Sequence, residues 1–391
     1  MTELQEKSEK NYDARTSLKE VYLSTLQGQS SIYGCRRVPS AGPLRPERLL
    51  VSTIARDFRI YSAAGKDVEY QDFLPFYLPQ DCQIISVDLF TYGSPRPTKF
   101  ITGVTWLNIN EASYFFNVYE STLDYENLTC ISSIELDAWV PFYLGNIFHD
   151  TRQASRCFLI SGSDCRIHAF AAENDAGGGA YVEMSEQNTV AKFPEFCVME
   201  SIALWLAFTH KDDFRVTAVA QENGTLLVFV VDVMTSELKE KYVYYEEGPL
   251  TRVMFFENSV DLFCLASLAP SKVFKNVIDH GLENSALLPL SDEFDVPTCC
   301  ALADIDFDGR QEILIGTYGE ELLVYRQSDE NISAWKLQWS KSFNNPIHGV
   351  FNLDLTNDGL KELIIVTVKT VIILQHDLKK VLELCQSRLK S

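Results

Sequence analysis

The feature that most constrains the fold of this sequence is an apolar, strand-like cluster that recurs about every 50 residues. Each cluster follows an earlier strand and a polar turn, and each is rich in β-branched or aromatic residues. The seven clusters centre on Tyr61, Val118, Ala169, Phe229, Phe274, Val324 and Ile373, at intervals of 57, 51, 60, 45, 50 and 49 residues. Seven units of this length are typical of a β-propeller, in which each blade is a four-stranded sheet. The sequence therefore predicts an all-β, seven-bladed β-propeller.

The N-terminal end of the chain differs from these repeats. It is rich in Glu and Lys with one aromatic residue, so we expect residues 1–20 to form a disordered tail and residues 21–376 to form a single propeller domain. Because a propeller must close into a ring, we expect the segment Ser30–Val38 to add a strand to the last blade. Two stacked β-sandwich domains are the alternative architecture, which explains the strands but not the regular interval.

Residues 377–391 are predicted to form a short C-terminal helix. Five residues share one of its faces: Leu378, Val381, Leu382, Cys385 and Leu389. A face of this kind either docks on its own propeller or binds a partner.

The composition argues against several classes of function. With 34 Lys and Arg against 54 Asp and Glu, the net charge is 34 − 54 = −20, which is unfavourable for binding nucleic acid or anionic membranes. No apolar run approaches the roughly 20 residues of a membrane span, and the N-terminus has no apolar signal segment. We therefore expect a cytoplasmic protein without direct membrane insertion, which reaches an organelle surface through its partners.

No motif of a known catalytic site is apparent. The ten cysteines contain no C-x-x-C pair, the six histidines are scattered, and neither a G-x-S-x-G nor a G-x-x-x-x-G-K-[ST] motif is present. We therefore expect a protein that is not an enzyme and that requires no cofactor.

An acidic loop near residue 304 has the spacing of a calcium-binding loop. Its acidic residues stand at positions 1, 3, 5 and 9, and they are Asp304, Asp306, Asp308 and Glu312, with Gly309 at position 6. Calcium prefers several oxygen ligands on a sharply bent loop, so these residues are candidate ligands of a structural Ca²⁺. The alternative is a tight turn in which the same side chains cap backbone N–H groups without an ion.

A second loop repeats this pattern 354 − 304 = 50 residues later. Its candidate ligands are Asp354, Thr356, Asp358 and Glu362. Threonine in place of the second Asp removes one charge, so this loop is predicted to be the weaker site. The two loops resemble the FG-GAP repeats of integrin α-subunit propellers.

Longer stretches of the sequence resemble one family. These stretches are SSIYG (30–34), EGPLTRV (247–253), VFKNVIDHGLENSALLPLSDEFD (273–295), DIDFDGRQEILIGTYGEELLVY (304–325) and LDLTNDGLKELIIVTVKTVIILQHDL (353–378). They resemble the kaptin family, and the likeness runs from about residue 30 to the C-terminal helix.

The resemblance implies a specific role. It implies a subunit of the KICSTOR complex, paired with a second FG-GAP propeller protein and joined to a very large scaffold protein. Such a complex holds the GATOR GTPase-activating complex on lysosomes and restrains TOR signalling when amino acids are scarce. The family has also been associated with actin at cell edges, so an actin-associated protein is the alternative function.

Two segments are candidates for contact with these partners. The stretch Val273–Asp295 is longer than a blade turn requires, and we expect it to bind the partner through Leu282, Leu287 and Leu288. Direct binding to actin, which is acidic, would need a basic patch, and Gly34–Leu50 is the most basic stretch.

Overall fold

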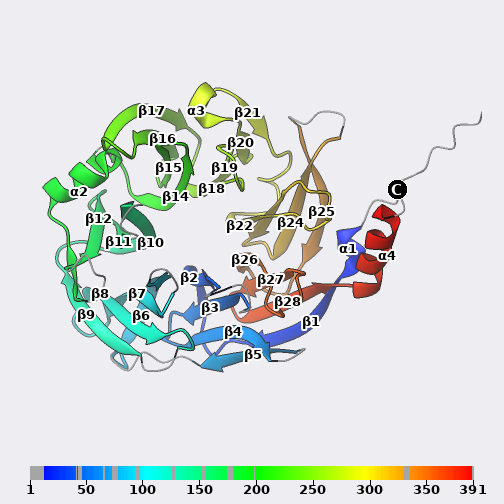
Figure 1. Ribbon diagram of the computed structural model, residues 1–391, viewed down its shortest axis with the longest axis horizontal. Coiled ribbons are helices and arrows are strands. Elements are labelled where there is room, and N and C mark those ends of the chain that lie inside the picture. The colour runs from blue at the N-terminus through cyan, green and yellow to red at the C-terminus, as the bar shows by residue number, and fades with distance from the viewer. Residues whose placement is uncertain are drawn as a thin grey trace, which may run out of the picture.

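The computed structural model describes residues 13–389 except for 41, 43–45, 65–66, 73–77, 94–96, 126–127, 151–154, 174–178, 198 and 330–333. These residues form seven four-stranded antiparallel sheets arranged around a common centre (Figure 1). The predicted seven-bladed β-propeller is therefore confirmed, and the two-sandwich alternative is wrong.

Each of the first three blades contains four strands that are consecutive in the chain. Blade 1 has β2 (Ser30–Val38), β3 (Arg48–Thr53), β4 (Phe58–Ala64) and β5 (Asp67–Asp72). Blade 2 has β6 (Cys82–Tyr92), β7 (Lys99–Asn108), β8 (Ser113–Thr122) and β9 (Thr129–Leu136). Blade 3 has β10 (Pro141–Asp150), β11 (Ser155–Gly162), β12 (Ile167–Ala172) and β13 (Tyr181–Glu183).

Helix α2 (Glu186–Lys192) and the 3-10 helix η1 (Pro194–Cys197) connect blades 3 and 4. Blade 4 has β14 (Ala203–Lys211), β15 (Phe214–Gln221), β16 (Thr225–Asp232) and β17 (Glu237–Tyr245). Blade 5 has β18 (Leu250–Phe255), β19 (Leu262–Ala266), β20 (Lys272–Phe274) and β21 (Ser285–Leu287), with α3 (Val277–His280) between the last two. Blade 6 has β22 (Pro297–Ala303), β23 (Glu312–Thr317), β24 (Glu321–Gln327) and β25 (Trp335–Ser342).

The clusters that predicted the repeat are the third strands of the blades. Tyr61 lies in β4, Phe229 in β16 and Val324 in β24. These strands read as apolar runs because blades stack face to face, so an interior strand is covered on both sides; seven of the eight residues of β16 are buried. The buried side chains of the described residues form seven apolar clusters, one between each pair of neighbouring blades.

The ring is closed by a strand from the N-terminal end of the chain. Blade 7 combines β26 (Ile347–Leu353), β27 (Glu362–Thr367) and β28 (Thr370–His376) with β1 (Leu18–Thr25). β1 runs antiparallel to β28, with Leu18 opposite His376 and Thr25 opposite Thr370. The expected closure is therefore present, but the predicted segment is wrong, because Ser30–Val38 is β2, the strand of blade 1 nearest the centre (Figure 1).

The boundary of the predicted tail also changes. Residues 13–20 are ordered, since α1 (Ala14–Ser17) leads directly into β1. β1 is an outer strand that buries only Leu18 and Ser24, and its first exposed residues, Lys19 and Glu20, resemble the residues of a tail. Residues 1–12 lie outside the described residues.

The C-terminal helix α4 (Leu378–Arg388) lies beside α1 (Figure 1). Asp377 caps it by accepting a hydrogen bond from Lys379 N at 3.0 Å, and Lys380 Nζ donates to Thr16 O at 3.0 Å. Val381 is buried, whereas Leu378, Leu382 and Cys385 are exposed, as is Leu389 just beyond the helix. The helix therefore docks on the N-terminal segment and leaves most of its apolar face open. Among the described helices, none has the length and apolar content needed to cross a membrane.

Candidate metal centre in the sixth blade

The first acidic loop connects β22 to β23, the two strands of blade 6 nearest the centre. Asp304 follows β22 and accepts hydrogen bonds from the backbone N–H of Asp308, at 3.1 Å, and of Gly309, at 2.9 Å. Gly309 has φ +88°, a left-handed conformation that glycine adopts without strain. The loop thus has the sharp bend that both the calcium-site and the ion-free interpretations require.

Three of the four predicted ligands meet at one point. One carboxylate oxygen each from Asp304, Asp306 and Glu312 lie within 4.8 Å of one another. Glu312, the first residue of β23, is fully buried, and its Oε2 accepts the backbone N–H of Ile305 at 2.8 Å. Its Oε1 has no hydrogen-bond partner among the residues that the structure describes.

The electrostatics of this cluster disfavour its negative charges. Burial raises the pKa of Glu312 to about 8, and the neighbouring charge of Asp306 contributes to that rise. Burial also raises the pKa of Asp306, with Asp308 as the next cause. Such shifts are expected where carboxylates are gathered away from water with too few cations beside them.

The fourth predicted ligand, Asp308, is held elsewhere. Its Oδ2 accepts a hydrogen bond of 2.7 Å from Nη2 of Arg326, a residue of β24. Its Oδ1 accepts a hydrogen bond of 2.8 Å from the backbone N–H of Arg310. Arg326 also forms an ion pair with Asp306, with Nε 3.4 Å from Oδ2. The structure therefore groups Asp308 with the arginines rather than with the other three carboxylates.

The second acidic loop, between β26 and β27 of blade 7, has the same backbone bonds. Asp354 accepts the backbone N–H of Asp358 at 3.2 Å and of Gly359 at 3.0 Å. The buried Glu362 differs from Glu312, because its Oε1 accepts Thr356 Oγ1 at 2.7 Å and Gln375 Nε2 at 3.3 Å. Uncharged donors thus satisfy the carboxylate of this loop.

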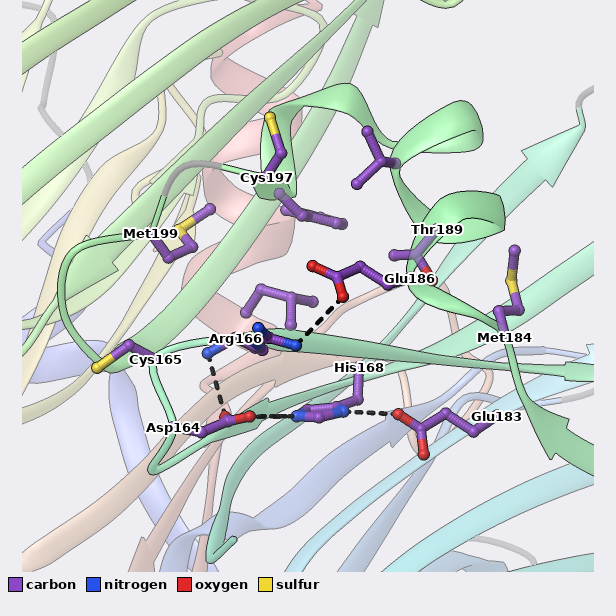
Figure 2. A pocket seen from close by; sticks show the side chains of 13 residues that line it. Asp164, Cys165, Arg166, His168, Glu183, Met184, Glu186, Thr189, Cys197 and Met199 are labelled. Atoms are coloured by element: carbon purple, nitrogen blue, oxygen red, sulfur yellow. Dashed lines mark hydrogen bonds and ion pairs between the residues drawn. The ribbon is translucent and has the colours of Figure 1, made fainter.

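A polar pocket lies between blade 3 and the α2–η1 connection (Figure 2). His168 crosses it, with Nδ1 2.7 Å from Glu183 Oε1 and Nε2 3.2 Å from Asp164 Oδ2. The imidazole also stacks on Trp139, with the ring centroids 3.9 Å apart. Both ring nitrogens are therefore occupied by neighbouring carboxylates rather than directed at a substrate.

Side chains of several blades meet at the centre of the ring. Trp205, from β14, stacks on Tyr33 with the ring centroids 6.1 Å apart, and the guanidinium of Arg252 lies 3.9 Å from the centroid of the Trp205 ring. Arg36 forms an ion pair with Asp88, with Nε 3.2 Å from Oδ1. Sequence reasoning missed this cluster, because its members are up to about 220 residues apart and no local pattern links them.

The three leucines predicted to bind a partner do not form one surface. Leu282 and Leu288 are buried in the cores beside blade 5, whereas Leu287 is 54% exposed. The stretch Val273–Asp295 is not an insertion, because it supplies most of β20, α3 and β21 of that blade. In this structure Leu282 and Leu288 are therefore not accessible for the predicted contact, and of the three leucines Leu287 alone is exposed.

The fold defines this chain as a seven-bladed β-propeller protein closed by its own N-terminal strand. Its sequence places it more narrowly. The chain belongs to the kaptin family, since the family model described as "KICSTOR complex protein kaptin" matches residues 18–262 and 257–386.

A named relative agrees with that assignment. The chain is 31% identical over 405 aligned positions to the mouse (Mus musculus) protein named KICSTOR complex protein kaptin, covering 95% of this chain and 91% of the relative.

Among solved structures, a chain from a crystal structure of BBS1N in complex with ARL6DN, soaked with lead, matches with a TM-score of 0.57 and 11% identity, covering 92% of this chain and 97% of the other. A chain of the mitotic checkpoint complex matches with a TM-score of 0.60 and 11% identity, covering 96% and 97%. At this identity the two structures support the fold alone.

Proposed function

We propose that this chain is a non-enzymatic scaffold subunit of a KICSTOR-like complex. The observation that carries the proposal is the kaptin family match, which spans the propeller from β1 to α4. Two features of the structure support a non-catalytic role. The charged side chains of the pocket in Figure 2 are paired with one another, and the centre of the ring is occupied by stacked aromatic and arginine side chains.

In this proposal the chain pairs with a second FG-GAP propeller protein and with a very large scaffold protein. The assembled complex recruits GATOR to the lysosomal surface and restrains TOR signalling when amino acids are scarce. The chain itself is cytoplasmic and reaches the lysosome through these partners. Exposed apolar side chains suit such contacts, and Leu382 of α4, which is 59% exposed, and Leu287 are two of them.

Direct binding to actin is less well supported. Within the basic stretch, Arg37 is paired with Glu47, and Arg36 is paired with Asp88. Arg48 packs against the ring of Tyr125, with its guanidinium 4.9 Å from the centroid. The three arginines of this stretch that the structure describes are thus engaged by neighbouring residues, which argues against a patch that would attract an acidic filament.

The proposal is tested in cells from which the chain has been removed. We expect GATOR to leave the lysosomes and TOR substrates to stay phosphorylated after amino-acid withdrawal, and re-expression of the chain to reverse both effects. Normal GATOR localisation and a normal TOR response in the deleted cells would reject the proposal. In that case, co-sedimentation of the purified chain with actin filaments would test the alternative.

A further inference from the structure

We propose that the loop between β22 and β23 binds one calcium ion through Asp304, Asp306 and Glu312, and that the equivalent loop of blade 7 binds none. Calcium lies 2.3–2.6 Å from its oxygen ligands, so two oxygens on opposite sides of one ion are at most about 4.6–5.2 Å apart. The three carboxylate oxygens are within 4.8 Å of one another, which allows a single ion to contact all three.

The strongest sign of a ligand is the carboxylate of Glu312. It is fully buried, and one of its oxygens lacks a partner among the described residues. A buried polar atom without a partner destabilises the folded chain, and does so more strongly when it is charged. A cation between Glu312, Asp304 and Asp306 would supply that missing interaction.

The surrounding charges leave room for a cation. Five carboxylates gather around the loop, against two guanidinium groups, so that full ionisation of all seven groups gives a formal charge of 2 − 5 = −3. The groups are Asp304, Asp306, Asp308, Glu312, Asp329, Arg310 and Arg326. The two arginines face Asp308, Asp329 and the Oδ2 of Asp306. They therefore leave the charges of Asp304 and Glu312 without a cationic partner among the described ion pairs.

Blade 7 provides an internal comparison. Thr356 stands where blade 6 has Asp306, and it donates to the carboxylate of Glu362. The strand pairings place Gln375 where blade 6 has Arg326, and Gln375 donates to the same oxygen. Because protein donors already satisfy Glu362, this loop needs no ion.

The ligands that we assign to the ion are three carboxylates at the two ends of one loop. The ion would therefore brace the turn between β22 and β23. This inference does not depend on the proposed role in a KICSTOR-like complex, and failure of one would leave the other standing.

Isothermal titration of CaCl₂ into the chelator-treated full chain tests the inference. We expect one site per chain with a Kd below about 1 mM, the weak end of protein calcium sites. Asp304→Asn and Glu312→Gln should each weaken binding at least about tenfold, whereas the matched blade 7 variants Asp354→Asn and Glu362→Gln should not change it.

Unfolding curves keep the test decisive if a variant is unstable. Calcium should raise the unfolding midpoint of the unsubstituted chain and of both blade 7 variants, with a smaller effect for Mg²⁺. Absence of both heat and a shift in the unsubstituted chain would overturn the inference. Two sites per chain would overturn the statement that the blade 7 loop binds none, and equal loss of binding from the blade 7 variants would overturn the assignment to blade 6.

Discussion

Two adjacent leucines give opposite predictions that test the packing of blade 5 directly. Leu288 is 0% exposed and lies in the cluster shared by blades 5 and 6, with Phe263 and Tyr325 among its members. Leu288→Ala removes three carbon atoms, worth about 2.4 kcal/mol at about 0.8 kcal/mol each. The cavity that remains adds to this loss, so we expect the free energy of unfolding to fall by about 2.5–5 kcal/mol.

Leu287 is the matched control, because it is the neighbouring residue and is 54% exposed. Leu287→Ala loses about half of the transfer free energy and leaves no internal cavity, so we expect a loss of at most about 1 kcal/mol. Unfolding in guanidinium chloride, followed by tryptophan fluorescence, measures both variants, and the buried Trp335 of the same cluster is a local reporter. Equal losses, or a loss below about 1 kcal/mol for Leu288→Ala, would refute this account of the core.

Three further predictions concern the frame of the propeller. The carboxylate of Glu195 is buried and accepts two hydrogen bonds of 2.9 Å from Arg215. Glu195→Ala should therefore lower the free energy of unfolding in urea by about 3–5 kcal/mol, and adding Arg215→Met should recover part of that loss. A loss below about 1 kcal/mol for Glu195→Ala would contradict this prediction. Deleting residues 1–25 removes β1 and uncovers the edge of β28, so we expect the truncated chain to aggregate. Light scattering measures the aggregation, and a stable monomer would be inconsistent with closure of the ring by β1. Burial lowers the pKa of His376 from 6.5 to about 4, so stability from this group is complete above pH 6.5 and is lost as the pH falls toward 4. Between pH 6.5 and 5 the free energy of unfolding should fall by about 2 kcal/mol because of this group. In His376→Gln the free energy of unfolding should fall by about 2 kcal/mol less over the same pH range. The same fall in the variant and the unsubstituted chain would argue against this role of His376.

The fold could be predicted because the most regular signal comes from strands covered on both faces. Val324 and Ile373 lie in such strands, and their spacing is set by the length of one blade. The closing strand could not be found in this way. β1 is an outer strand with few buried residues, so its sequence carries little of the apolar pattern that marks the others.

The candidate site was predictable in part. The spacing of Asp304, Asp306 and Glu312 fixes a bend that brings their carboxylates together. The position of Asp308 depends on Arg326, which comes from another strand, so the loop sequence alone does not contain it.

Burial within blade 5 was not predictable either. Leu287 and Leu288 are the same residue type in adjacent positions, and only the placement of β21 against blade 6 decides which of them faces the core.

The proposed role of this chain, as one subunit of a KICSTOR-like assembly, can be tested by isolating its partners. The most direct measurement is affinity purification of the full chain, tagged at its N-terminus, from amino-acid-starved cells, with co-purifying proteins quantified by mass spectrometry. The account predicts near-stoichiometric recovery of a second propeller protein and a very large scaffold protein, retained at high salt. Recovery of actin alone under the same conditions, or of no stoichiometric partner, would contradict it.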